Sequence, residues 1–122
     1  MPATFGELAA LPKTRVMAPI DLGSHILLFT PHEVVAAPYH RAERAVKAAF
    51  DFFNGPVEAA RNILAERGVT LVAVCAAMPE MRGQPDAAPD SFVRQFAAGT
   101  LPDWLDEVSA PDAVLKVFRV RP

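Results

Sequence analysis

The sequence predicts an α/β fold: a small three-layer α/β/α domain of about four strands, with the first three parallel and the last an edge strand. Short apolar runs bounded by proline and glycine alternate along the chain with longer segments of helical periodicity. Right-handed crossovers through such helices place successive strands parallel in one sheet. The chain has 122 residues, the usual size of one domain, so we expect residues 1–122 to fold as a single α/β domain.

The expected strands are runs of apolar and β-branched residues, each closed by a turn-forming residue. They comprise residues 15–20, 33–38, 69–76 and 113–120. The last run alternates, with one face made of Val114, Lys116, Phe118 and Val120 and the other of Leu115, Val117 and Arg119. This alternation is typical of a half-exposed strand, which predicts the edge position and leaves the strand direction open.

The most regular helix is predicted for residues 41–53, where apolar side chains recur every three or four positions. Other helices are expected at residues 4–10, 24–29, 56–67 and 90–98. Their ends carry known signals, namely a Thr4–Glu7 capping box, N-caps at Ser24 and Asp90, Pro56 as a first helical residue and Gly68 as a C-cap. Residues 78–89, which contain several prolines, should form a surface loop. A helical turn at residues 102–105 should bring Trp104 against the core.

The composition excludes several classes of function. With a net charge of −2 and no basic tract, the chain is not expected to bind nucleic acid. Its apolar runs are far shorter than the ~20 residues needed to cross a bilayer, and its first residues lack the features of a signal peptide. Cys75 is the only cysteine, so no internal disulfide is expected. A homo-oligomer is compatible with this composition.

Residues that follow the carboxyl ends of parallel strands meet at one edge of the sheet, where open α/β folds bind ligands. Here the candidates for ligand or acceptor binding are Asp21, Tyr39, His40 and Arg41, with residues 75–78 after the third strand. For Asp21, capping of the following turn is the alternative. The sequence has neither the three-glycine dinucleotide motif nor a phosphate-binding loop, so no nucleotide cofactor is expected.

The histidines and the cysteine give weaker evidence for a metal or catalytic site. His25, His32 and His40 lie in different elements, whereas zinc sites usually contain a close ligand pair. Ordinary hydrogen-bonded or partly exposed histidines are the better interpretation, and no metal is expected. Cys75 with His40 as its base would form a nucleophilic pair, but the apolar strand around Cys75 favours an inert thiol. No catalytic residue is assigned.

Two further groups of side chains have both a structural and a functional interpretation. Arg41 and Arg44, one helical turn apart, either bind a phosphate or carboxylate or belong to an exposed helix face. Phe50, Phe52 and Phe53 either belong to the core or form a docking face for a partner.

The stretch VMAPIDLGSHILLFTPHEVVAAPYHR resembles part of the soluble C-terminal domain that bacterial polytopic C-type glycosyltransferases carry after their last transmembrane helix. In that family a strand leads into an Asp-x-Gly turn, a short helix and a second strand that ends in a Pro-Tyr-His-Arg-like sequence. The stretch is also similar, more distantly, to the WWDYG region of the oligosaccharyltransferase catalytic subunit. Asp21 and Gly23 match that motif, whereas Pro19 and Ile20 stand at the positions of the tryptophans.

This resemblance implies a non-catalytic soluble domain of a membrane glycosyltransferase-like protein, which helps to shape an acceptor or partner site on the periplasmic side. The parent protein would use a polyprenyl-phosphate sugar, and its transmembrane part would hold the domain at the inner membrane. In such enzymes the acids that transfer the sugar and bind the metal lie in loops between membrane helices, so the isolated domain should have no turnover. The alternative is a free-standing, cytoplasmic α/β module that binds a ligand or a protein.

Overall fold

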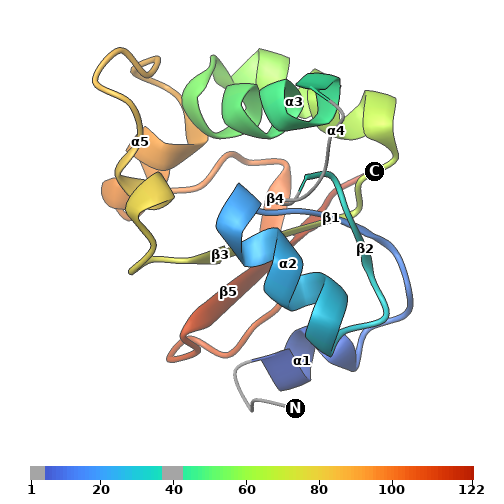
Figure 1. Ribbon diagram of the computed structural model, residues 1–122. Helices are drawn as coiled ribbons and strands as arrows, with labels where there is room; N and C mark the ends of the chain where they lie inside the picture. Colours follow the sequence, from blue (N-terminus) through green and yellow to red (C-terminus); the bar gives the residue numbers. More distant parts are fainter. Residues whose placement is uncertain (1–4, 37–42) are drawn as a thin grey trace.

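The computed structural model describes residues 5–36 and 43–122, in which short strands alternate with helices (Figure 1). The helices are α1 (Gly6–Ala9), α2 (Ile20–Phe29), α3 (Glu43–Asn54), α4 (Val57–Arg67), the 3₁₀ helix η2 (Pro79–Arg82) and α5 (Phe92–Ala97). The strands are β1 (Arg15–Met17), β2 (Glu33–Val34), β3 (Leu71–Cys75), β4 (Leu105–Glu107) and β5 (Leu115–Val120). Thr4 of the expected capping box lies outside the described residues.

The strands of the described residues form one mixed sheet in the order β2-β1-β3-β5-β4. β1 is parallel to β2, with Arg15 opposite Glu33, and parallel to β3, with Val16 opposite Leu71. The parallel arrangement predicted for the first three strands is therefore confirmed. β5 runs antiparallel to both of its neighbours, β3 and β4.

The edge position predicted for the last strand is wrong. β5 lies between β3 and β4, because Leu105–Glu107 forms an additional strand that takes the edge. The segment expected to be a helical turn is a tight turn, closed by the N–H of Leu105 donating to the carbonyl of Pro102, and it leads directly into β4. Trp104 is buried against the core, as predicted.

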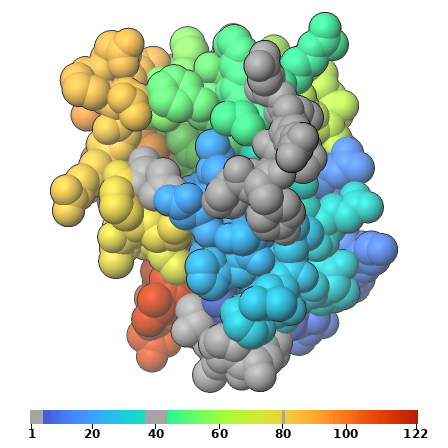
Figure 2. All heavy atoms as spheres, in the orientation of Figure 1, coloured from blue at the N-terminus to red at the C-terminus, as the bar shows by residue number. Residues whose placement is uncertain are grey.

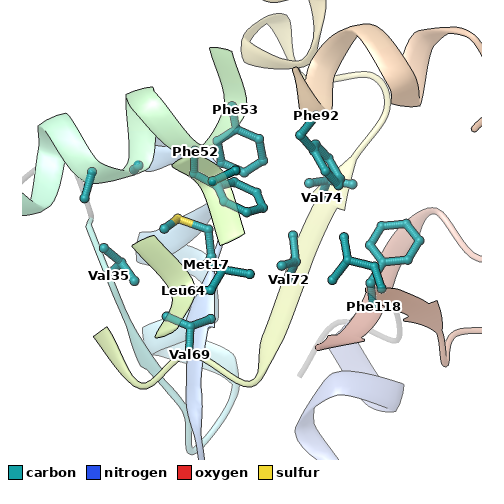
Figure 3. Packing of buried hydrophobic residues seen from close by; sticks show 14 of the residues in the cluster. Met17, Val35, Phe52, Phe53, Leu64, Val69, Val72, Val74, Phe92 and Phe118 are labelled. Carbon is teal, nitrogen blue, oxygen red and sulfur yellow. The ribbon is translucent and has the colours of Figure 1, made fainter. Parts of the chain in front are cut away.

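Helices cover both faces of the sheet, so the three-layer α/β fold is confirmed (Figure 1). One face packs against α3, α4 and α5 and contributes Met17, Val72, Val74 and Phe118 to the core (Figure 3). The other face packs against α1 and α2 and contributes Val16, Leu71, Ala73, Leu115 and Val117. The alternation predicted for β5 is thus confirmed, since its successive residues enter opposite cores.

The larger core is built around aromatic rings (Figure 3). Phe52 of α3 is fully buried, and its ring centroid lies 4.9 Å from that of Phe53, 5.4 Å from that of Phe92 and 6.4 Å from that of Trp104. Phe50, two positions before Phe52, faces away from this core and is 47% exposed, because residues two apart on a helix point in different directions. Phe52 and Phe53 therefore belong to the core, whereas Phe50 lies at the surface.

Helix α2 begins earlier than predicted. Pro19 is extended (φ −54°, ψ 147°), and its carbonyl accepts N–H groups from the first turn, so the helix begins at Ile20. Ser24, the expected N-cap, lies inside the helix, and its hydroxyl donates to the carbonyl of Asp21 at 3.2 Å. β1 is correspondingly shorter than expected and ends at Met17.

The junction around α4 follows the predicted signals closely. Pro56 is the N-cap and not the first helical residue, so the helix begins at Val57, one residue later than expected. Gly68 is the C-cap with φ +64°, a left-handed conformation that favours glycine. The N–H of Val69 then donates to the carbonyl of Leu64, which closes the helix end and starts the path into β3.

Residues 78–89 contain η2 and are otherwise irregular. Met81 is buried in the larger core. The guanidinium of Arg94, in α5, donates to the carbonyls of Gln84 and Pro85 at 3.0 and 3.2 Å. These contacts attach the segment to α5, while the N–H of Gln84 donates to the side chain of Asn54 in α3.

Helix α5 is capped by Ser91 and not by Asp90, which corrects the predicted cap. The buried Ser91 hydroxyl accepts the N–H of Arg94 at 3.3 Å. Ser91→Ala is therefore expected to lower the free energy of unfolding by about 1 kcal/mol in urea denaturation. Asp90→Ala is the matched control and should change it by less than ~0.5 kcal/mol. Equal losses in the two variants would contradict this assignment of the cap.

Candidate functional site

The carboxyl end of β1 leads into a pocket between the start of α2 and the side of α3. Pro19 and Ile20, which follow the strand, form one wall. The other lining residues come from α3 and from the segment before α5, and they are Ala49, Phe50, Phe53, Asn54 and Gln84. This is the edge at which open α/β sheets bind ligands.

The pocket has mainly apolar walls, and its lining includes the amide residues Asn54 and Gln84. Phe53 is almost completely buried, whereas Phe50 is half-exposed. Asn54 joins α3 to the segment before α5, since its Nδ2 donates to the Phe50 carbonyl at 3.1 Å and its Oδ1 accepts the Gln84 N–H at 2.8 Å. Apolar walls with a few fixed polar groups suit an apolar side chain of a peptide or the apolar part of a small ligand.

Asp21 directly follows Ile20, which lines this pocket, and it is exposed. It is the second residue of α2, so its carboxylate lies at the positive end of the helix dipole. Pro19 occupies the N-cap position, so Asp21 belongs to the first turn of the helix and is not its N-cap residue. Asp21 remains the acid of the candidate site.

The other three candidates, Tyr39, His40 and Arg41, lie outside the described residues. Their approach to Asp21 stays a prediction. Arg44, which was considered together with Arg41, is exposed near the start of α3. Its exposure agrees with the interpretation of an exposed helix face.

The outer side of α2 carries two exposed leucines. Leu28 is 74% exposed and Leu27 is 38% exposed. Asp21, His25 and Leu28 follow the spacing of one helical stripe, so the acid and an exposed leucine share the same side of α2. Figure 2 shows α2 (light blue to cyan) in the middle of this face of the molecule. None of the helices within residues 5–36 and 43–122 is long and apolar enough to cross a membrane.

The described histidines have structural partners. His32 is buried, its Nε2 lies 2.7 Å from the Leu8 carbonyl, and its Nδ1 accepts the Thr14 N–H at 3.2 Å. The exposed His25 stacks on Phe5 with the ring planes 1° apart. The interpretation of hydrogen-bonded or partly exposed histidines is confirmed for these two, while His40 is not described. In the described part of the chain, no group of three or more histidine, cysteine, aspartate or glutamate side chains could hold a metal ion.

Cys75 is half-buried at the end of β3, and burial raises the pKa of its thiol. A raised pKa lowers the thiolate fraction near neutral pH, which is the opposite of what an activated nucleophile needs. We expect iodoacetamide to label the native protein more slowly at pH 7.5 than the urea-unfolded protein, by roughly threefold or more. Mass spectrometry of the alkylated chain would measure both rates. Equal rates would show that Cys75 is not shielded.

The raised pKa of Cys75 also determines how this residue makes the stability of the fold depend on pH. The unfolded chain loses its thiol proton at lower pH than the folded chain, so the contribution of Cys75 to stability is present below the unfolded pKa and is lost as the pH rises through the folded pKa. A thiol that is protonated across the neutral range supports a structural role for Cys75.

Sequence patterns did not reveal Asn54 and Gln84 as pocket residues. Asn54 directly follows the helix predicted for residues 41–53, and Gln84 belongs to the predicted loop 78–89, which has no periodicity. Their contact depends on tertiary structure, since 30 positions separate them along the chain. The one local signal was Asn54 itself, because a side-chain amide at a helix end often bonds to neighbouring backbone groups.

Together, the sheet and this edge define a class of protein: a small α/β domain with an exposed acid beside a pocket at the carboxyl end of β1. The fold is that of the C-terminal globular domain of an oligosaccharyltransferase from Archaeoglobus fulgidus. Its crystal structure matches with a TM-score of 0.68 over 99% of this chain and 99% of that chain, at 17% sequence identity. No protein-family model matches the chain, and no curated protein matches its sequence. The resemblance noted in the sequence is thereby confirmed at the level of the fold.

Proposed function

We propose that this chain is a non-catalytic domain of a membrane glycosyltransferase-like protein, in which it helps to shape an acceptor or partner site. The observation that carries the proposal is the likeness in fold, over almost the whole chain, to an oligosaccharyltransferase C-terminal domain. The pocket beside Asp21 supports it, because it provides a binding surface at the functional edge of the sheet.

The membrane-embedded part of the parent protein is the partner that this proposal requires. Exposed large apolar side chains favour a surface that is covered in the assembled protein, and Leu27, Leu28 and Phe50 are of this kind. The domain would then work on the periplasmic or extracellular side. Asp21, with Tyr39, His40 and Arg41, would contact the acceptor, while the membrane part would bind the polyprenyl-phosphate sugar.

The full-length gene product provides the test. It should fractionate with membranes and transfer a radiolabelled sugar from a polyprenyl-phosphate donor to endogenous acceptors. Asp21→Asn should lower this transfer about tenfold, because a charged contact with the acceptor is lost. Asp112→Asn removes an exposed acid in the turn before β5 and should leave transfer unchanged. A gene product without transmembrane segments, or equal rates for both variants and the unmodified protein, would contradict the proposal.

A free-standing ligand- or protein-binding module is the second candidate function. The half-exposed Phe50 at a preformed pocket favours it, since such a pocket also suits a small ligand. Size-exclusion chromatography and a thermal-shift screen test this alternative directly. A monomer whose melting temperature no ligand raises would count against it.

A further inference from the structure

The opposite end of the sheet carries a second pocket, where β1 and β3 begin. Its apolar walls include Leu11 and Leu71. Its polar groups are Lys13, Thr14, Thr70 and Arg119, so cations and hydroxyls line this pocket and no acid does. β1 and β3 are parallel, and this pocket is therefore separated from the candidate site by the length of the strands.

Asp106 and Glu33, which belong to strands at this end of the sheet, already have arginine partners. Asp106 lies opposite Arg119 in the β4–β5 pair, but its two carboxylate oxygens accept from Arg121 at 2.6 and 2.8 Å. The pKa of Asp106 is lowered, mainly by this hydrogen bond to Arg121 and also by the charges of Arg121 and Arg119. Glu33 is paired with Arg15 at 3.1 Å. Arg119 is therefore close to a carboxylate that another arginine has already neutralised.

Two cationic side chains and one hydroxyl proton of this pocket can interact with a ligand. Lys13 and Arg119 are exposed, and within the described residues their side chains form no hydrogen bond or ion pair. The hydroxyls of Thr14 and Thr70 are hydrogen-bonded to each other. Since one of these hydroxyls donates to the other, the second keeps a proton that it can donate to a ligand.

We propose that this pocket binds a soluble phosphate-class anion, with Lys13 and Arg119 as its charge partners and the Thr14–Thr70 pair as a neutral donor. A guanidinium matches two phosphate oxygens at once, and an ammonium adds a compact positive charge. The exposed large apolar residues of the described chain, Leu27, Leu28, Phe50 and Val114, do not line this pocket. A membrane surface would lack the apolar anchor that it usually needs, which favours a soluble anion over a lipid headgroup.

Titration of the ¹⁵N-labelled chain with inorganic phosphate, at constant ionic strength, tests this proposal. The amide signals of Lys13, Thr14, Thr70 and Arg119 should shift in a saturable manner with phosphate and not with chloride. Arg119→Gln should weaken the apparent affinity about tenfold, because a charge-assisted pair of hydrogen bonds is lost. Arg61→Gln removes an exposed arginine from α4 with the same change in net charge, and it should bind phosphate as the unmodified chain does.

The outcomes separate specific binding from simple screening. Shifts that rise linearly without saturating, or equal weakening in the two variants, would overturn the proposal. If Arg119→Gln does not fold, as judged by its circular dichroism, Lys13→Gln takes its place and should weaken binding about fivefold. Sedimentation with phosphatidylcholine vesicles containing phosphatidylglycerol distinguishes the source of the phosphate. Binding to these vesicles without any response to free phosphate would overturn the assignment of a soluble anion.

Discussion

Phe52→Ala is expected to lower the free energy of unfolding by about 3–5 kcal/mol, the largest single effect that the structure predicts. The ring is fully buried, and it contacts the rings of Phe53, Phe92 and Trp104. Two of these contacts, with Phe53 and Trp104, are edge-to-face arrangements, which add to the free energy of burial. Removal of the ring would leave a cavity where α3, α5 and the turn before β4 meet. Urea denaturation followed by tryptophan fluorescence would measure the loss, since Trp104 lies next to the cavity.

Phe50→Ala is the matched control, because it removes the same side chain from the same helix at an exposed position. We expect it to change the free energy of unfolding by less than ~1 kcal/mol. It should also remove part of the pocket wall beside Asp21, so any loss of ligand binding would occur without a loss of fold. Similar losses of stability in both variants would contradict the placement of Phe52 in the core and Phe50 at the surface.

The part of the fold that the sequence predicted is the part determined by local pattern. β3 is a continuous run of apolar residues, which is typical of a strand that is buried on both faces. The helix α4 has a turn-forming residue at each end, Pro56 before it and Gly68 after it. These signals depend only on neighbouring residues, and the structure confirms them. The parallel arrangement of the first three strands followed from the handedness of the crossovers and needed no knowledge of specific contacts.

β4 could not be predicted, because its identity depends on pairing. Leu105, Asp106 and Glu107 include only one apolar residue and show no sustained alternation. They form a strand because β5 offers an unpaired edge, and two acidic residues on such an edge strand also oppose pairing with another chain. Missing this strand is the reason that β5 was placed at the edge.

Only the part of the candidate site that depends on chain order could be predicted from the sequence. Asp21 could be placed by chain order, since a residue that follows a buried parallel strand lies at the edge where open α/β sheets bind ligands. The beginning of α2 was harder to place. Pro19 and Ile20 continue an apolar pattern that favours a strand. In the structure, Pro19 is the extended residue before the helix, and Ile20 is the first residue of the helix. For the contact between Asn54 and Gln84 the only local signal is the amide of Asn54 at a helix end, and nothing in the sequence points to Gln84 as its partner.

His32→Leu is expected to lower the free energy of unfolding by about 2–3 kcal/mol. His32 is 2% exposed, and its ring lies between the Leu8 carbonyl of α1 and the Thr14 N–H at the start of β1. Leucine has a similar size but no polar atom, so the Thr14 N–H would lose its partner and α1 would lose one attachment to the sheet. Chemical denaturation measures this loss. His25→Leu, at an exposed position of α2, is the matched control and should cost less than ~1 kcal/mol.

The same histidine gives a second, spectroscopic test. Because Nδ1 accepts a hydrogen bond from Thr14, the ring proton of neutral His32 must lie on Nε2, where it is donated to the Leu8 carbonyl. Long-range ¹H–¹⁵N spectra should therefore show the Nε2-protonated tautomer for His32. In this tautomer Nε2 donates a hydrogen bond and the lone pair of Nδ1 accepts one, so neither nitrogen is available to a metal ion. These two hydrogen bonds give His32 a structural role. A neutral ring protonated at Nδ1, or a loss of stability no larger than that of His25→Leu, would contradict this role.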